Sequence, residues 1–209
     1  NDLVGKTWRI DPYACEGCGV CAYVCPAHAI RMAPEVNGEW YVSDTRHGPM
    51  VHARLGIAQE NSGKLVTTVR KAAREIAERD GLDLVLIDGS PGIGCPVIAS
   101  IAGASMILIV TEPTLSGLHD MDRVAQLARH FGKPAAVAVN KYDINPEIAL
   151  KIESSAGEAG IEVFGRIGYD SDVTRAQVNG TSIVEYGDGT ATREVTALWQ
   201  ALATKLGVE

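Results

Sequence analysis

From about residue 62 onward, short apolar runs alternate with segments in which apolar residues recur every three or four positions. Uninterrupted apolar runs of this length predict strands buried on both faces, which is typical of a parallel sheet. The predicted strands cover residues 84–87, 106–110, 135–139 and 163–167. The segments between them have the period of helices that pack on such a sheet. The pattern therefore predicts an α/β domain over residues 61–209, with a parallel sheet between two layers of helices.

Three of the predicted helices carry an apolar stripe on one face, and each stripe can pack on the sheet. Asn145 followed by Pro146 predicts the start of a further helix, because an amide side chain can cap the first turn and proline fits its first position. Four strands are few for such a sheet, and none precedes the first helix. We therefore expect that part of the sheet is missing on the N-terminal side. The three stripes are Leu65, Val69, Ala72 and Ile76; Leu118, Met121, Val124 and Leu127; and Val195, Leu198, Leu202 and Leu206.

Residues 1–60 have a different character. They are rich in cysteine, glycine, proline and histidine and contain only short extended pieces, such as residues 39–42. This composition predicts a small, loop-rich module that is separate from the α/β domain.

Four of the five cysteines, Cys15, Cys18, Cys21 and Cys25, lie in a C-x2-C-x2-C-x3-C-P run that ends at Pro26. This spacing is typical of iron–sulfur sites, and small residues between the cysteines let backbone N–H groups approach the sulfides. Zinc and a disulfide framework are the alternatives. Structural zinc usually joins two C-x2-C pairs across a longer gap, and nothing else in the chain resembles a secreted protein. The run therefore predicts a [4Fe-4S] cluster held by these cysteines.

In ferredoxins with two clusters, the fourth cysteine of such a run binds the other cluster, whose own run returns the missing ligand. A single run is present in this sequence. The fifth cysteine, Cys95, lies in a glycine-rich loop and is expected to be a small buried residue rather than a ligand. The sequence thus predicts half of a ferredoxin module, and we expect the natural chain to begin upstream of Asn1.

Composition narrows the function classes. The chain has 209 residues, of which 46% are hydrophobic and 22% are charged, as in an ordinary globular protein. Its formal net charge of −7 argues against a general nucleic-acid-binding surface. No apolar run reaches the roughly eighteen residues that span a bilayer, so no membrane span is expected. Free cysteines and the absence of a signal-like stretch fit a reducing cytoplasm best.

Ligands of open parallel sheets bind beyond the carboxyl ends of the strands. The strand predicted at residues 84–87 is followed by Asp88 and by a loop rich in glycine and proline that includes Gly92. A carboxylate in this position can hold Mg2+ through water, and a glycine beyond it lets a backbone N–H approach a terminal phosphate. The alternative is a plain connection in which Asp88 caps the next helix.

Two further strand ends carry polar residues. Residues 111–116 are expected to cap the helix that begins near Ser116, and Ser62 is expected to cap the first long helix. Asn140 and Asp143 stand in an N-K-x-D sequence directly after a strand, where they can contact a purine base, with solvated turn residues as the alternative. The phosphate-binding sequence G-x-x-x-x-G-K-[ST] does not occur.

Taken together, the cysteine run, the segment after Ser62 and residues 88–96, 111–120 and 140–143 resemble one family. This family is the MinD/ParA-type P-loop ATPases that carry an inserted ferredoxin domain, and the resemblance covers nearly the whole chain. It implies that Asp88 is the Walker B carboxylate near Mg2+, that Gly92 senses the γ-phosphate and that Asn140 contacts the adenine. It also implies ATP or ADP with Mg2+ as the cofactor, rather than a guanine nucleotide.

Members of that family begin with a strand and a Walker A loop and carry two cysteine runs, whereas this sequence has one run and no Walker A loop. The resemblance implies a parent ATPase with two [4Fe-4S] clusters, and it implies that this chain alone does not hydrolyse ATP. The expected function couples nucleotide binding or hydrolysis to electron or cluster transfer to a redox or iron–sulfur acceptor protein, with a homodimer as the expected assembly. The alternative is a nucleotide-independent, ferredoxin-like electron-transfer module whose α/β part is a docking scaffold.

Overall fold

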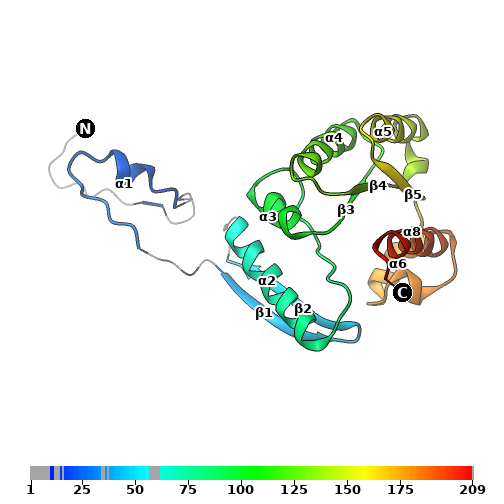
Figure 1. Ribbon diagram of the computed structural model, residues 1–209, viewed down its shortest axis with the longest axis horizontal. Helices are drawn as coiled ribbons and strands as arrows, with labels where there is room; N and C mark the ends of the chain where they lie inside the picture. Colours follow the sequence, from blue (N-terminus) through cyan, green and yellow to red (C-terminus); the bar gives the residue numbers. More distant parts are fainter. Residues whose placement is uncertain are drawn as a thin grey trace.

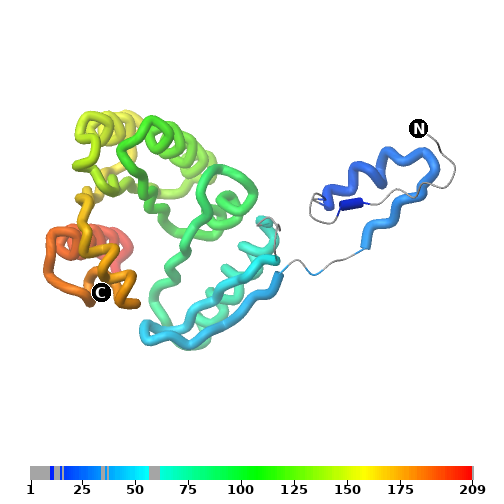
Figure 2. Tube along the Cα trace, turned by 180° about the vertical axis from the view of Figure 1, so that it is seen from behind, coloured from blue at the N-terminus to red at the C-terminus, as the bar shows by residue number. Residues whose placement is uncertain are grey.

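The structure is a computed structural model that describes residues 10–11, 15, 17–33, 36, 38–56 and 62–208. The segment that bears the cysteines contains helix α1 (Val20–Val24) and stands apart from the other elements in both views (Figures 1 and 2). A β-hairpin with two helices follows it, and a parallel sheet with its helices completes the chain.

The hairpin consists of β1 (Gly38–Thr45) and β2 (Gly48–Leu55), which pair antiparallel. It contains the extended piece predicted at residues 39–42. Helix α2 (Gly63–Asp80) packs on β2 and on helix α3 (Cys95–Gly103). The apolar stripe of α2 was predicted to pack on the parallel sheet. In the structure, this helix packs on the hairpin instead.

The parallel sheet has the strand order β3-β4-β5, with Val137 of the central strand paired to Ile109 and Val163. Three of the four predicted strands are thereby confirmed to within one residue. The strands are β3 (Ile107–Thr111), β4 (Ala135–Asn140) and β5 (Glu162–Ile167); the elements around them are α4 (Leu115–His130), the 3-10 turn η1 (Tyr142–Ile144), α5 (Pro146–Glu158), α6 (Ser171–Val178), α7 (Ile183–Tyr186) and α8 (Thr190–Leu206).

The fourth predicted strand, at residues 84–87, is not a strand in the structure. No strand pairs with it in the described part of the chain, and Leu82, Leu84 and Leu86 are 44%, 37% and 86% exposed. An apolar run becomes a strand only where a neighbour supplies ladder hydrogen bonds and covers its side chains. The prediction of a fourth strand is therefore wrong for the described residues.

Helices cover both faces of the sheet, which confirms the predicted three layers (Figure 1). On one face, Met121 of α4 and Ile152 of α5 join Val137 in one buried cluster, and both are at most 1% exposed. On the other face, Leu198 of α8 lies against Gly165 of β5. Val137 and Val139 belong to the buried cluster and Ala138, which lies between them and pairs with Gly165, does not, so Gly165 and Leu198 lie on the opposite face.

The helix caps predicted from the sequence are confirmed. They satisfy N–H groups of the first turn that have no partner within the helix, and Pro146 is the first residue of α5 as expected. The side chains of Ser62, Thr114 and Asn145 accept bonds from the N–H groups of Leu65, Gly117 and Ile148 at 3.2, 2.9 and 3.2 Å.

Candidate functional site

Three of the four cysteines in the run share one hollow. Cys15, Cys18 and Cys21 line a hollow of about 240 Å³. Gly17 and Gly19, which also line it, have φ angles of 66° and 76°, a conformation that glycine adopts without strain and that curls the backbone around the hollow. Soft thiolates at the rim of such a hollow fit the ligand set of an iron–sulfur cluster. The other lining residues are Ile10, Ile30, Arg31 and Met32.

Cys25 is not among the residues that line this hollow. Its Sγ accepts a hydrogen bond from the N–H of Ala29 at 3.4 Å. This bond and those from the N–H groups of Ala27 and its neighbours lower the pKa of the Cys25 thiol, because they stabilise the thiolate. The backbone after α1 is thus arranged to support a thiolate at this position, the form in which cysteine binds metal.

The remaining cysteine differs from its prediction. Cys95 is exposed at the start of α3, so the expectation of a buried residue is wrong. The backbone and Cβ of Cys95 lie against Gly63 at the start of α2, but the residue as a whole stays open to solvent at the N-terminus of its helix. Over the ranges that the structure describes, no three histidine, cysteine or carboxylate side chains converge as ligands of a single metal ion.

A second candidate site lies at the carboxyl edge of the parallel sheet. Asn140 is the last residue of β4 and is half-buried, and Asp143 follows it in η1. Asp143 Oδ1 accepts the N–H of Tyr169 at 2.7 Å, and Glu194 Oε2 accepts the N–H of Gly168 at 2.8 Å. Asp143 therefore holds the loop that follows β5 beside the end of β4, and Glu194 ties the same loop to α8.

The ends of β3 and β4 are joined by an ion pair that the sequence did not predict. Lys141 Nζ donates to Glu112 Oε1 at 2.6 Å, and Lys141 has a φ angle of 54°. A non-glycine residue in this left-handed conformation is uncommon and often occurs at functional sites. No local sequence signal could have revealed the pair, because its two members belong to different strand ends.

Asp88 and Gly92 lie on the loop between residues 84–87 and α3. Asp88 is exposed, and Gly92 has a φ angle of 83° with no atom within 4 Å of the place where a Cβ would stand. The structure thus places Asn140 and Asp143 at the carboxyl end of β4, and Asp88 and Gly92 on the loop that precedes α3.

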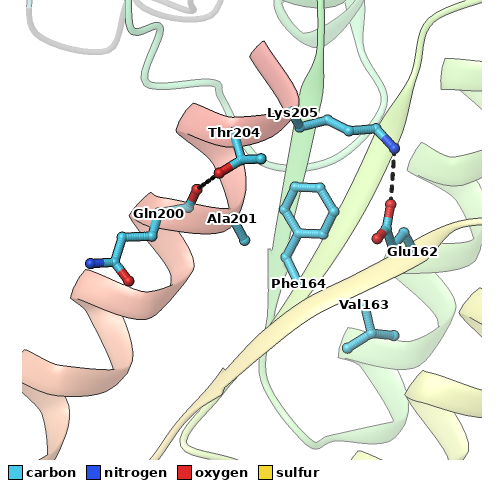
Figure 3. A pocket seen from close by; sticks show the side chains of 7 residues that line it. All are labelled: Glu162, Val163, Phe164, Gln200, Ala201, Thr204 and Lys205. Carbon is cyan, nitrogen blue, oxygen red and sulfur yellow. Dashed lines mark hydrogen bonds and ion pairs between the residues drawn. The ribbon is translucent and has the colours of Figure 1, made fainter. Parts of the chain in front are cut away.

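A larger hollow than the one at the cysteines lies elsewhere (Figure 3). It occupies about 620 Å³ between β5 and α8, and Lys205 Nζ donates to Glu162 Oε2 at 3.0 Å across it. Glu162 is the first residue of β5, so this hollow lies at the amino end of the strand. Because ligands of parallel sheets bind at the carboxyl ends, we do not take this hollow as the candidate site.

Comparison with known proteins bears on both parts of the chain. A family model for the 4Fe-4S binding domain matches residues 8–31, which include the whole cysteine run. The MinD protein of Pyrococcus horikoshii, solved as a complex with Mg-ADP, has the same fold as the second part: 18% identity, a TM-score of 0.58, and coverage of 70% of this chain and 58% of that one. The chain thus resembles MinD/ParA-type proteins in the fold of its second part and matches a 4Fe-4S binding domain in its first. The predicted fold class is thereby confirmed.

Sequence relatives agree with this assignment. An uncharacterised protein of Methanocaldococcus jannaschii is 30% identical over 145 residues, which cover 69% of this chain and 50% of that protein. An uncharacterised ATP-binding protein of the same organism is 33% identical over 109 residues, which cover 52% of this chain and 41% of that protein. This MinD/ParA-like chain spans about half the length of the curated relatives it matches. Its described helices include none that is long and apolar enough to cross a membrane.

Proposed function

We propose that the protein couples the nucleotide state of its MinD-like domain to electron or cluster transfer by an iron–sulfur module. The observation that carries this proposal is that one chain contains both the hollow lined by Cys15, Cys18 and Cys21 and a parallel sheet with Asn140 and Asp143 at its carboxyl edge. When bound, a [4Fe-4S] cluster supplies a centre that takes up and releases an electron. The proposed partner is a redox or iron–sulfur acceptor protein in the cytoplasm.

We assign the cysteines to two clusters. Cys15, Cys18 and Cys21 would hold one cluster, and Cys25, which does not line their hollow, would bind a second one. This division follows the ligand exchange of two-cluster ferredoxins. The remaining ligands would come from a second cysteine run in the whole protein.

We propose that a nucleotide binds beyond the carboxyl ends of the strands. Asn140 and Asp143 would lie next to the adenine, Asp88 would hold Mg2+ through water, and the backbone of Gly92 would approach the terminal phosphate. The open space around Gly92 supports a close approach of that kind. The Mg-ADP complex of the Pyrococcus horikoshii MinD protein and the ATP-binding relative support a nucleotide as the ligand.

The unpaired leucines point to how the sheet would be completed. Leu84 and Leu86 of the segment 84–87 are 37% and 86% exposed, and Val110 of the edge strand β3 is 56% exposed. We propose that in the whole protein a further strand, leading into a phosphate-binding loop, lies between this segment and β3. ATP hydrolysis, and the homodimer expected from the resemblance, would depend on that loop.

The iron content of the full-length protein, purified without oxygen, tests the cluster module. Cys21→Ser should lose most of its iron and visible absorbance, because the residue lines the hollow. Cys95→Ser is the matched control, since Cys95 is an exposed cysteine of another segment, and it should keep both. Iron-free wild-type protein, or equal iron in the two variants, would contradict the assignment.

Calorimetric titration with ATP and Mg2+ tests the nucleotide site of the same full-length protein. Asn140→Ala should weaken binding while leaving the iron content unchanged. The reduction potential of the cluster should then differ between the nucleotide-bound and nucleotide-free forms. Tight binding without any change in potential would count against coupling.

A nucleotide-independent electron carrier is the second candidate function. It is favoured because two side chains at the candidate nucleotide site already have partners within the protein. Asp143 accepts the N–H of Tyr169, and Lys141 pairs with Glu112. In that case the α/β part serves as a docking scaffold. Iron-loaded full-length protein that gives no heat with ATP and Mg2+ would select this function.

A further inference from the structure

The tip of the β1–β2 hairpin contacts the segment that runs from the end of α6 into α7, more than a hundred residues further along the chain. Arg46 Nη2 donates to Glu185 Oε2 at 3.0 Å, and both Nη atoms approach the carbonyl oxygen of Gly180, at 3.4 and 3.5 Å. His47 Nε2 lies 3.8 Å from Glu185 Oε1. Figures 1 and 2 both place the hairpin tip beside this segment.

The Glu185 carboxylate, which accepts the bond from Arg46, is held in place by hydrogen bonds at the start of its own helix. Glu185 Oε2 accepts the N–H and the Oγ–H of Ser182, each at 2.8 Å, and the N–H of Glu185 donates back to Ser182 Oγ. These bonds, with a smaller contribution from Arg46, lower the pKa of Glu185 to about 2. The carboxylate is therefore charged and oriented whether or not Arg46 is bound to it.

The contact is polar and exposed. The side chains of Arg46 and Glu185 are 57% and 37% exposed, and residues 44–49 of the hairpin bury no apolar side chain there. Exposed ion pairs contribute little stability and are screened by salt. The hairpin tip can therefore leave this position without unpacking a core, while β2 remains on α2.

The segment that receives Arg46 is joined to the carboxyl edge of the sheet. Asp143 holds the N–H of Tyr169, and Asp170 then caps α6 through the N–H of Asp172 at 2.9 Å. At the other end of α6, the N–H and Oγ1 of Thr181 donate to the carbonyl oxygen of Ala176, at 3.0 and 3.2 Å. A displacement of the loop after β5 would therefore move α6, Gly180 and Glu185 together.

We propose that Arg46 and Glu185 form a releasable clasp that links the carboxyl edge of the sheet to the hairpin next to the cysteine segment. Movement of the loop at Asp143 and Tyr169 opens or closes the clasp and thereby frees or holds the hairpin. The contacts of the clasp lie within this chain and do not depend on any ligand. Its use for signalling between nucleotide and cluster rests on the function proposed above.

Amide hydrogen exchange, measured by mass spectrometry on the iron-loaded protein without nucleotide, tests the clasp. Residues 38–55 should exchange about twofold or more faster in Arg46→Ala and in Glu185→Gln than in the wild type. Arg46→Lys keeps the positive charge and should restore most of the protection. Arg74→Ala is the matched control, because it removes an exposed arginine whose ion pair with Glu78 lies within one helix, and it should leave exchange of the hairpin unchanged.

The link to the sheet edge is tested by Asp143→Ala, which removes the acceptor of Tyr169 N–H. Faster exchange in residues 38–55, reversed in Asp143→Asn, would support the link.

Wild-type exchange in both Arg46→Ala and Glu185→Gln would overturn the clasp, and wild-type exchange in a folded Asp143→Ala would overturn the link. If Asp143→Ala does not fold, exchange at raised salt decides, since screening should loosen the hairpin in the wild type and leave Arg46→Ala unaffected. Because no nucleotide is added, a negative result here is distinct from failure to bind ATP.

Discussion

Gly63, the first residue of α2, lies directly against the backbone of Cys95, the first residue of α3. A Cβ at Gly63 would stand 2.9 Å from the carbonyl oxygen of Cys95, closer than side chains approach in proteins. Two long-separated helices therefore begin side by side, next to the loop that carries Asp88 and Gly92. The absence of a side chain at residue 63 is what allows this approach.

Gly63→Ala should lower the free energy of unfolding by about 1–3 kcal/mol, because the added methyl group must push two backbones apart. Gly157→Ala in α5 is the matched control, since no atom lies within 4 Å of its would-be Cβ. There the substitution should raise stability by about 0.5–1 kcal/mol through helix propensity. Denaturant unfolding measures both, and equal effects of the same sign would contradict the close approach.

The core around the parallel sheet should be sensitive to cavity formation. Ile152 of α5 is 0% exposed, so Ile152→Ala should cost about 2–5 kcal/mol of unfolding free energy. Leu150 of the same helix is 57% exposed, and Leu150→Ala should cost less than about 0.5 kcal/mol. Thermal unfolding followed by circular dichroism can compare the two. A larger loss in Leu150→Ala would mean that α5 presents its other face to the sheet.

The Thr114 cap should support the start of α4. Thr114 Oγ1 accepts the N–H of Gly117 at 2.9 Å, so Thr114→Ala should lower stability by about 1 kcal/mol. Thr114→Ser keeps the acceptor oxygen and should retain most of that stability. Chemical denaturation of the three proteins gives the comparison, and an unchanged midpoint in Thr114→Ala would show that the hydroxyl does not serve as a cap.

Glu185 should contribute to the acid sensitivity of the protein. Its pKa is lowered from 4.5 to about 2, first by the backbone N–H of Ser182, so the folded state prefers the ionised carboxylate more than the unfolded state does. The resulting stability is present above the unfolded pKa of 4.5 and is lost as the pH falls through 2. Between these two pH values, the free energy of unfolding should therefore fall less steeply with decreasing pH in Glu185→Gln than in the wild type. Parallel declines would indicate that Glu185 titrates normally.

Local patterns predicted much of the fold. The three strands of the parallel sheet and the caps at Ser62, Thr114 and Asn145 follow from periodicity and short-range hydrogen bonding. The spacing of the cysteine run likewise predicted the 4Fe-4S binding domain, because ligand spacing along a short segment is itself a geometric constraint.

Some features depend on partners that are distant in the sequence, and local patterns misjudged them. Residues 84–87 have the composition of a buried strand, yet Leu86 is largely exposed, because none of the strands in the described part of the chain pairs with them. Cys95 is apolar enough to be buried but is exposed at the start of α3, a position that its local sequence did not reveal.

The sequence by itself determined the properties of short segments. These are the apolar pattern of each strand and helix, the residues that cap the helices, and the spacing of the four cysteines in the run. Only the tertiary structure decided that Cys25 stands outside the hollow of the other three, that Asp143 holds the loop after β5, and that Arg46 reaches Glu185. The physical reason is that these relationships join segments whose separation and orientation are set by packing, and packing energy is summed over the whole fold rather than encoded in any one stretch of chain.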